Sequence, residues 1–121
     1  MKKFVLIILL MVMNVSFALN KENTIVDSLK TALTKTKNDT TRVKILNELS
    51  KNNFYRTPKI GIKYSTEALQ LARKINWKKG IAQAYTNLGI CYWVNANHQE
   101  SINNFKKSAK LLMFIRCVVR Y

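Results

Sequence analysis

The chain has 121 residues, enough for one small domain. Its formal net charge is +15, but lysine and arginine are scattered along the sequence and do not gather on one helix face with aromatic residues between them. This distribution argues against a nucleic-acid partner. We interpret it as a solvated basic surface with at most weak attraction to anionic membrane surfaces.

The N-terminal segment has the pattern of a secretory signal. A pair of lysines precedes an apolar run from Phe4 to Met13, and Ser16 and Ala18 place small residues where a signal peptidase reads. The run is about ten residues long, whereas a membrane-crossing helix needs roughly 20. Residues 1–18 therefore predict a cleaved signal peptide and an exported, periplasmic or extracytoplasmic protein, and an uncleaved N-terminal anchor is the alternative. Cleavage removes two lysines and lowers the net charge from +15 to +13.

Three amphipathic helices are expected next, each marked by apolar residues three and four apart. The first covers residues 23–36 and, with the turn after it, makes up a leading segment at 19–40. The second covers residues 41–54 and the third residues 58–75. Asn76 is suited to the left-handed conformation that ends many helices.

Residues 81–109 are the most informative stretch, because they predict two amphipathic helices joined by a short turn. Asn97 and Glu100 have the spacing of an N-cap and its reciprocal partner, so the second helix should begin directly after Asn97. Gly89 costs about 1 kcal/mol relative to alanine inside a helix, so a neighbour must pack against it. We expect Phe105 of the second helix to enter the space that Gly89 leaves open.

The spacing of these residues resembles the tetratricopeptide repeat (TPR) pattern, W-x-x-L-G-x-x-Y followed by A-x-x-x-F. The matching residues are Tyr85, Leu88, Gly89, Tyr92, Ser101 and Phe105. Tyr85 replaces the usual tryptophan, and Ser101 and Ser108 stand where the family usually has alanine. The resemblance implies an all-α fold, a right-handed α-α superhelix of TPR helical hairpins with about two repeats plus a leading helix.

A weaker repeat precedes the clear one. Gly61 occupies the place that Ser101 has in the clear repeat, and Ser50 stands in the place of Gly89. The resulting period is longer than the roughly 34 residues of the common unit and resembles a longer TPR variety. The resulting divisions are a signal peptide at 1–18, a leading helix and turn at 19–40, a degenerate TPR-like repeat at 41–76, a TPR repeat at 77–112 and an atypical apolar tail at 113–121.

The tail at 113–121 is apolar with two arginines, contains no turn signal and does not resemble a third repeat. A TPR array usually needs about three repeats, since each buries its face only against its neighbours. The tail therefore either associates with a second copy or another partner, or it marks a chain truncated or frameshifted within a longer protein. The second interpretation is the favoured one.

Reactive side chains do not form a convergent set. His98 is the single histidine, the six acidic residues are spread singly, and the three glycines are too dispersed to cradle a phosphate. Cys91 lies on the helix that carries Gly89 and is interpreted as a small packing residue, while a bridge to Cys117 is left open. We therefore expect a non-enzyme without a cofactor or a metal.

The TPR resemblance implies that the first helix of each repeat lines a concave groove that binds a protein or peptide ligand. Trp93 is the best single candidate, because exposed aromatic residues often anchor interfaces. Contact with a further repeat is the alternative role for Trp93. The groove residues carried over from the resemblance are Lys44, Asn47, Lys51, Tyr55, Gln83, Thr86, Asn87, Ile90 and Trp93.

The order of signal, leading helix and long repeats resembles the extracytoplasmic N-terminal TPR region of bacterial sensory and signalling proteins. We therefore expect an exported protein–protein interaction module, and on that resemblance a truncated sensory region of a membrane signalling protein. A basic peripheral protein that binds anionic lipid or polymer is the alternative function.

Overall fold

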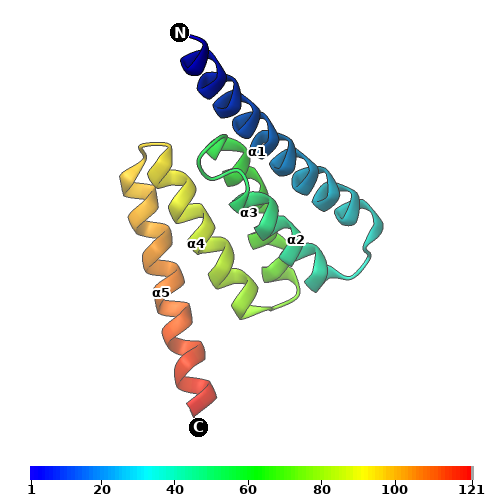
Figure 1. The fold of residues 1–121 in the computed structure, drawn as a ribbon. Helices are drawn as coiled ribbons and strands as arrows, with labels where there is room; N and C mark the ends of the chain where they lie inside the picture. The colour runs from blue at the N-terminus through cyan, green and yellow to red at the C-terminus, as the bar shows by residue number, and fades with distance from the viewer. Residues whose placement is uncertain (121) are drawn as a thin grey trace.

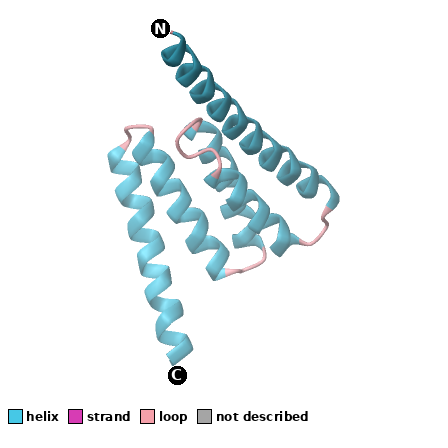
Figure 2. Ribbon diagram, viewed as in Figure 1, coloured by secondary structure: helices cyan, strands magenta, loops and turns pink. Residues whose placement is uncertain are grey.

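The structure, a computed structural model, describes residues 1–120 except for the side chains at positions 19 and 22. Tyr121, the last residue of the expected tail, lies outside the described residues. Within residues 1–120 the helices are α1 (Lys2–Lys35), α2 (Asp39–Lys51), α3 (Pro58–Lys74), α4 (Lys78–Val94) and α5 (His98–Arg120). No strand occurs in this part of the chain (Figure 2), so the all-α prediction is confirmed.

The helices pack mainly against their neighbours in sequence, and α2 also contacts α4. Figure 1 shows the α2–α3 and α4–α5 connections at one end of the molecule and the α1–α2 and α3–α4 connections at the other. The N-terminal half of α1 extends past the first end, and the C-terminal part of α5 extends past the second. The first and last helices therefore each carry a part that no neighbouring helix covers.

The core lies between α2, α3 and α4. Its buried members are Val43 and Leu46 of α2, Ala68, Leu69 and Ala72 of α3, and Ala84, Tyr85 and Leu88 of α4. Helix α1 contributes a partly buried Leu33 to this cluster, and none of the described α1 side chains is buried. Because apolar burial is the main stabilising term, α2, α3 and α4 hold the fold together.

Helix α1 begins much earlier than the amphipathic helix expected at 23–36. The sequence predicted an amphipathic helix at 23–36 after a separate segment at 1–18, whereas the structure has one continuous helix from Lys2 to Lys35. Residues 2–35 contain no glycine or proline, so no helix breaker separates the apolar segment from the amphipathic one. Within residues 1–120, α1 is the one helix long and apolar enough to cross a bilayer, and its apolar stretch is not buried against the rest of the chain. A signal sequence near an N-terminus has the same properties.

Helix α2 begins and ends earlier than expected. It starts at Asp39, because the Asn38 side chain accepts a hydrogen bond from the Thr41 backbone N–H at 2.9 Å and caps the helix. It ends at Lys51 instead of near residue 54, so the α2–α3 loop is longer than the sequence suggested.

Two short turns share one geometry. Asn76, between α3 and α4, has φ of 53°, and Ala96, between α4 and α5, has φ of 59°. In both turns the next backbone N–H reaches back to a carbonyl of the preceding helix at 2.8 Å, which is the Schellman arrangement. The expectation for Asn76 is confirmed. Ala96 was not anticipated, because alanine rarely adopts a left-handed conformation.

Helix α5 begins at His98 as expected, and the Asn97 side chain accepts a hydrogen bond from the Glu100 backbone N–H at 3.3 Å. It then continues without a break to Arg120, so residues 113–120 of the expected tail extend the second helix of the hairpin.

Candidate binding groove

Each hairpin is closed by one serine and one glycine. In the α2–α3 hairpin, Ser50 Oγ donates a hydrogen bond to the carbonyl oxygen of Gly61 at 2.9 Å. In the α4–α5 hairpin, Ser101 Oγ donates to the carbonyl oxygen of Gly89 at 2.8 Å. The serine is on the first helix in one hairpin and on the second helix in the other. The two hairpins therefore make the same contact with the partners exchanged.

The glycines permit close approach, as expected for Gly89. A Cβ atom added at Gly89 would lie 2.7 Å from the Phe105 ring, which confirms that Phe105 occupies this space. A Cβ atom added at Gly61 would lie 2.6 Å from Cys91 Sγ. Cys91 is fully buried, and its Sγ lies 3.8 Å from Ser50 Oγ, so its expected role as a packing residue is confirmed.

The two cysteines differ in environment and are both free. Burial raises the pKa of the Cys91 thiol, and the hydrogen bond with Ser50 partly opposes this shift. Cys117 is exposed on α5. The bridge that the sequence left open is therefore not formed.

The two first helices are held together by a pair of buried amides. Asn87 Nδ2 of α4 donates to Asn47 Oδ1 of α2 at 3.1 Å, and to the Asn47 carbonyl at 3.3 Å. Asn47 is 4% exposed and Asn87 is 2% exposed. A satisfied buried amide pair sets the position of α4 against α2.

A hollow of about 630 Å³ lies between α2 and α4. Its lining consists of Lys44, Asn47, Glu48, Trp77, Lys79, Gly80 and Gln83. The Trp77 indole lies so close over Gly80 that an added Cβ atom there would collide with it. Lys44 Nζ lies 6.0 Å from the centroid of the same indole. The hollow is therefore bounded by an aromatic ring and by amide and charged side chains.

A smaller hollow of about 230 Å³ lies between α4 and α5. Its lining consists of Lys79, Ala82, Gln83, Thr86 and Leu112. Because Lys79 and Gln83 line both hollows, the two adjoin. We call the pair the binding groove.

The charge of the binding groove is mainly positive. Lys44 and Lys79 line it, and Glu48 is its one acidic lining residue. Lys51 Nζ lies 3.0 Å from the Glu48 carboxylate, so this negative charge is already paired. An anionic group entering the groove would meet two lysines without a competing unpaired carboxylate in the lining.

The residues carried over from the TPR resemblance occupy different environments. Lys44, Asn47 and Gln83 line the larger hollow, and Gln83 and Thr86 line the smaller one. Outside both hollows lie Lys51, Tyr55, Asn87, Ile90 and Trp93.

Trp93, the best single candidate from the sequence, is 58% exposed, and its ring centroid lies 4.6 Å from that of His98 at the α4–α5 turn. Trp77 and Lys79 line the larger hollow, and Leu112 lines the smaller one; these three residues were not among those predicted from the sequence. The adjacent Gly80 was the available signal for Trp77, because a glycine near a helix start marks a close approach.

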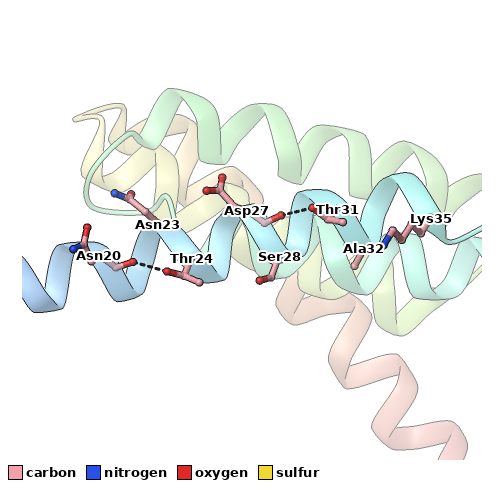
Figure 3. A pocket seen from close by; sticks show the side chains of 8 residues that line it. All are labelled: Asn20, Asn23, Thr24, Asp27, Ser28, Thr31, Ala32 and Lys35. Carbon is pink, nitrogen blue, oxygen red and sulfur yellow. Dashed lines mark hydrogen bonds between the residues drawn. The ribbon is translucent and has the colours of Figure 1, made fainter.

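A further hollow of about 850 Å³ runs along α1 (Figure 3). All of its lining residues belong to α1. The hydrogen bonds drawn in Figure 3, from Thr24 to the Asn20 carbonyl and from Thr31 to the Asp27 carbonyl, stay within the helix. One helix alone does not make side chains converge, so we assign no site there. Within the described residues, no group of three or more histidine, cysteine or acidic side chains is placed to hold a metal ion.

No family model, curated protein or solved structure matches the chain. Its function is therefore inferred from the geometry of the groove.

Proposed function

We propose that the chain is an exported interaction module that binds an extended segment of another protein in the binding groove. In this proposal, hairpins α2–α3 and α4–α5 are two TPR repeats of a right-handed superhelix. Two features support the repeat assignment: the serine–glycine contact present in both hairpins, and the packing of the first helices α2 and α4 against each other. The apolar half of α1 directs export, and binding rather than catalysis is the activity.

The observation that carries the proposal is the continuity of the groove. Lys79 and Gln83 join a larger hollow, walled by Trp77, to a smaller one that ends at Leu112. The exposed amide of Gln83 in the larger hollow can hydrogen-bond a peptide backbone, whereas Leu112 suits an apolar side chain. The positive charges of Lys44 and Lys79 favour an acidic residue in the same segment. The ligand is therefore an extended segment with an acidic and an apolar side chain.

The test uses the full chain in a phosphatidylcholine nanodisc, where the lipid accommodates the apolar half of α1. Short peptides selected from a random display library serve as the probe. The readout is tryptophan fluorescence in a Trp93→Phe protein, in which Trp77 is the remaining tryptophan. We expect acidic peptides to be selected and to change Trp77 fluorescence on binding.

Lys79→Glu should abolish this binding, because it reverses a charge that lines both hollows. Lys63→Glu is the matched control, since it makes the same charge change at an exposed position on α3. Failure to select any peptide, or equal binding by the Lys79→Glu and Lys63→Glu proteins, would overturn the proposal.

A further inference from the structure

Helix α5 is longer than the helix it packs against. Lys78, the first residue of α4, places its Nζ 4.2 Å from the centroid of the Phe114 ring. Residues 115–120 continue α5 beyond this point for about 9 Å at 1.5 Å per residue. Figure 1 shows this end of α5 projecting past the start of α4. We call residues 112–120 the α5 extension.

The α5 extension exposes large apolar side chains. Val118 is 60% exposed and Val119 is 81% exposed. Leu112, Met113 and Phe114 are each at least 49% exposed. Single exposed apolar residues are ordinary, but several together on one projecting helix form a contact surface.

Positive charge accompanies this apolar surface. Helix α5 carries five cations, and no acidic residue occurs in the sequence after Glu100. The cations are Lys106, Lys107, Lys110, Arg116 and Arg120. At 100° per residue, Leu111, Ile115 and Val118 share one side of the helix, and Val119 lies next to them. Lys110, Arg116 and Arg120 lie on the other side. Met113 and Cys117 lie among these cations, so this side is mixed rather than wholly cationic. A helix with an apolar side and cations on the opposite side is typical of segments that lie on anionic membranes.

We propose that the α5 extension docks on the surface of an anionic lipid bilayer. Its exposed valines enter the boundary between head groups and acyl chains, while the arginines and lysines contact the anionic head groups. Charge complementarity selects lipid over a second copy of the chain. Two α5 helices side by side would bring five cations against five cations without an acidic partner in residues 101–120. The proposal does not depend on peptide binding in the groove.

The test follows an environment-sensitive fluorophore on the α5 extension of the full chain, again held by α1 in a phosphatidylcholine nanodisc. One protein is labelled at the exposed Cys117, on the cationic side of the helix. The other is labelled on the apolar side, at Val119→Cys in a Cys117→Ser background. The buried Cys91, whose pKa is raised by burial, stays unlabelled in both proteins.

Vesicles containing phosphatidylglycerol should shift the emission of the Val119→Cys label to the blue, more strongly than that of the Cys117 label. High salt should reverse the shift. Arg116→Gln with Arg120→Gln should weaken vesicle binding about 25-fold, because each cation near an anionic surface contributes about fivefold. Lys59→Gln with Lys63→Gln removes the same charge from exposed positions on α3 and should have a much smaller effect.

Three results would overturn the proposal: no shift with phosphatidylglycerol, an equal shift with phosphatidylcholine vesicles, or a shift that grows with protein concentration in the absence of vesicles. The third would identify a second copy of the chain as the occupant. Because Val119 and Cys117 are exposed, these labels do not disturb the core, and circular dichroism checks that the helices are retained.

Discussion

Both hairpins contain a serine–glycine contact between their two helices, but the helix that supplies each residue differs. In α4–α5 the first helix supplies Gly89 and the second helix supplies Ser101, whereas in α2–α3 the first helix supplies Ser50 and the second helix supplies Gly61. The hydrogen bond from the serine hydroxyl to the glycine carbonyl has nearly the same length in both, 2.8 Å in α4–α5 and 2.9 Å in α2–α3. Close packing of the two helices therefore requires one small pair joined by a hydrogen bond, not a glycine at a set position.

The surroundings of the two glycines differ more than the contacts themselves. Gly61 faces the fully buried Cys91, which has no free space to move into, whereas Gly89 faces Phe105, which is 39% exposed. The α2–α3 hairpin, whose sequence looks degenerate, should thus be the less tolerant of the two.

A large loss of stability is expected for Gly61→Ala. Its new Cβ would lie 2.6 Å from Cys91 Sγ and 3.4 Å from the Ser50 carbonyl oxygen. Overpacking costs about 1–3 kcal/mol, and the helix propensity of alanine returns about 1 kcal/mol. We expect a net loss of up to about 2 kcal/mol, measured by denaturant unfolding. Gly89→Ala is the matched comparison and should change stability by less than about 1 kcal/mol, because the Phe105 ring can turn toward solvent. A larger loss for Gly89→Ala would show that the motif glycine governs packing after all.

Replacing each serine with alanine should again destabilise the α2–α3 hairpin more than the α4–α5 hairpin. Ser50 Oγ also lies 2.5 Å from Ser65 Oγ, and both residues are fully buried. Ser50→Ala therefore leaves the Ser65 hydroxyl and the Gly61 carbonyl short of a partner and should cost about 1–3 kcal/mol. Ser101→Ala should cost about 1 kcal/mol or less, since only one hydrogen bond is lost. Equal losses in denaturant unfolding would mean that the Ser65 contact adds nothing.

The two left-handed turns offer a smaller and opposite effect. Ala96→Gly should stabilise the chain by about 1 kcal/mol, because alanine is strained at a φ of 59° and glycine is not. Asn76→Gly should change stability by only a few tenths of a kcal/mol, because asparagine tolerates this conformation. Thermal unfolding of the two variants measures the difference. No rise for Ala96→Gly would indicate that the greater freedom of glycine in the unfolded chain cancels the relief of strain.

The smallest expected effect is a pH dependence of the unfolding free energy that arises from Cys91. Cys91 of α4 packs against Ser50 of α2 and Gly61 of α3. Since the folded state raises the pKa of Cys91, the unfolded chain loses the thiol proton at a lower pH than the folded chain does. The stabilisation is complete below the ordinary thiol pKa of 9.0 and declines as the pH rises past it. Denaturant unfolding of the parent and of Cys91→Ala between neutral and alkaline pH measures this difference. An unchanged difference across that range would contradict a buried neutral thiol.

Much of the α4–α5 hairpin could be predicted from the local sequence pattern. Helical periodicity and the N-cap Asn97 located α5, and the glycine inside a helix identified Phe105 as its neighbour, because each signal joins residues that are close in sequence. The length of α1 was missed, since an apolar helix and a following amphipathic helix merge when no breaker separates them. The separate roles of export, self-association and truncation remain predictions.

What the sequence determined by itself is the succession of helices and the packing of Phe105 against Gly89 in the α4–α5 hairpin. Only the tertiary structure decided which polar residues of α2 and α4 face the groove and which face each other. Asn47 and Asn87 lie far apart in the sequence and pair in the interior, whereas Lys44 and Gln83 stay at the surface of the same helices. Helical spacing indicates a face but not its partner, because the rotation of α4 against α2 is set by side-chain packing between distant segments. The same rotation brings Trp77 and Lys79 to the groove and leaves Trp93 beside His98.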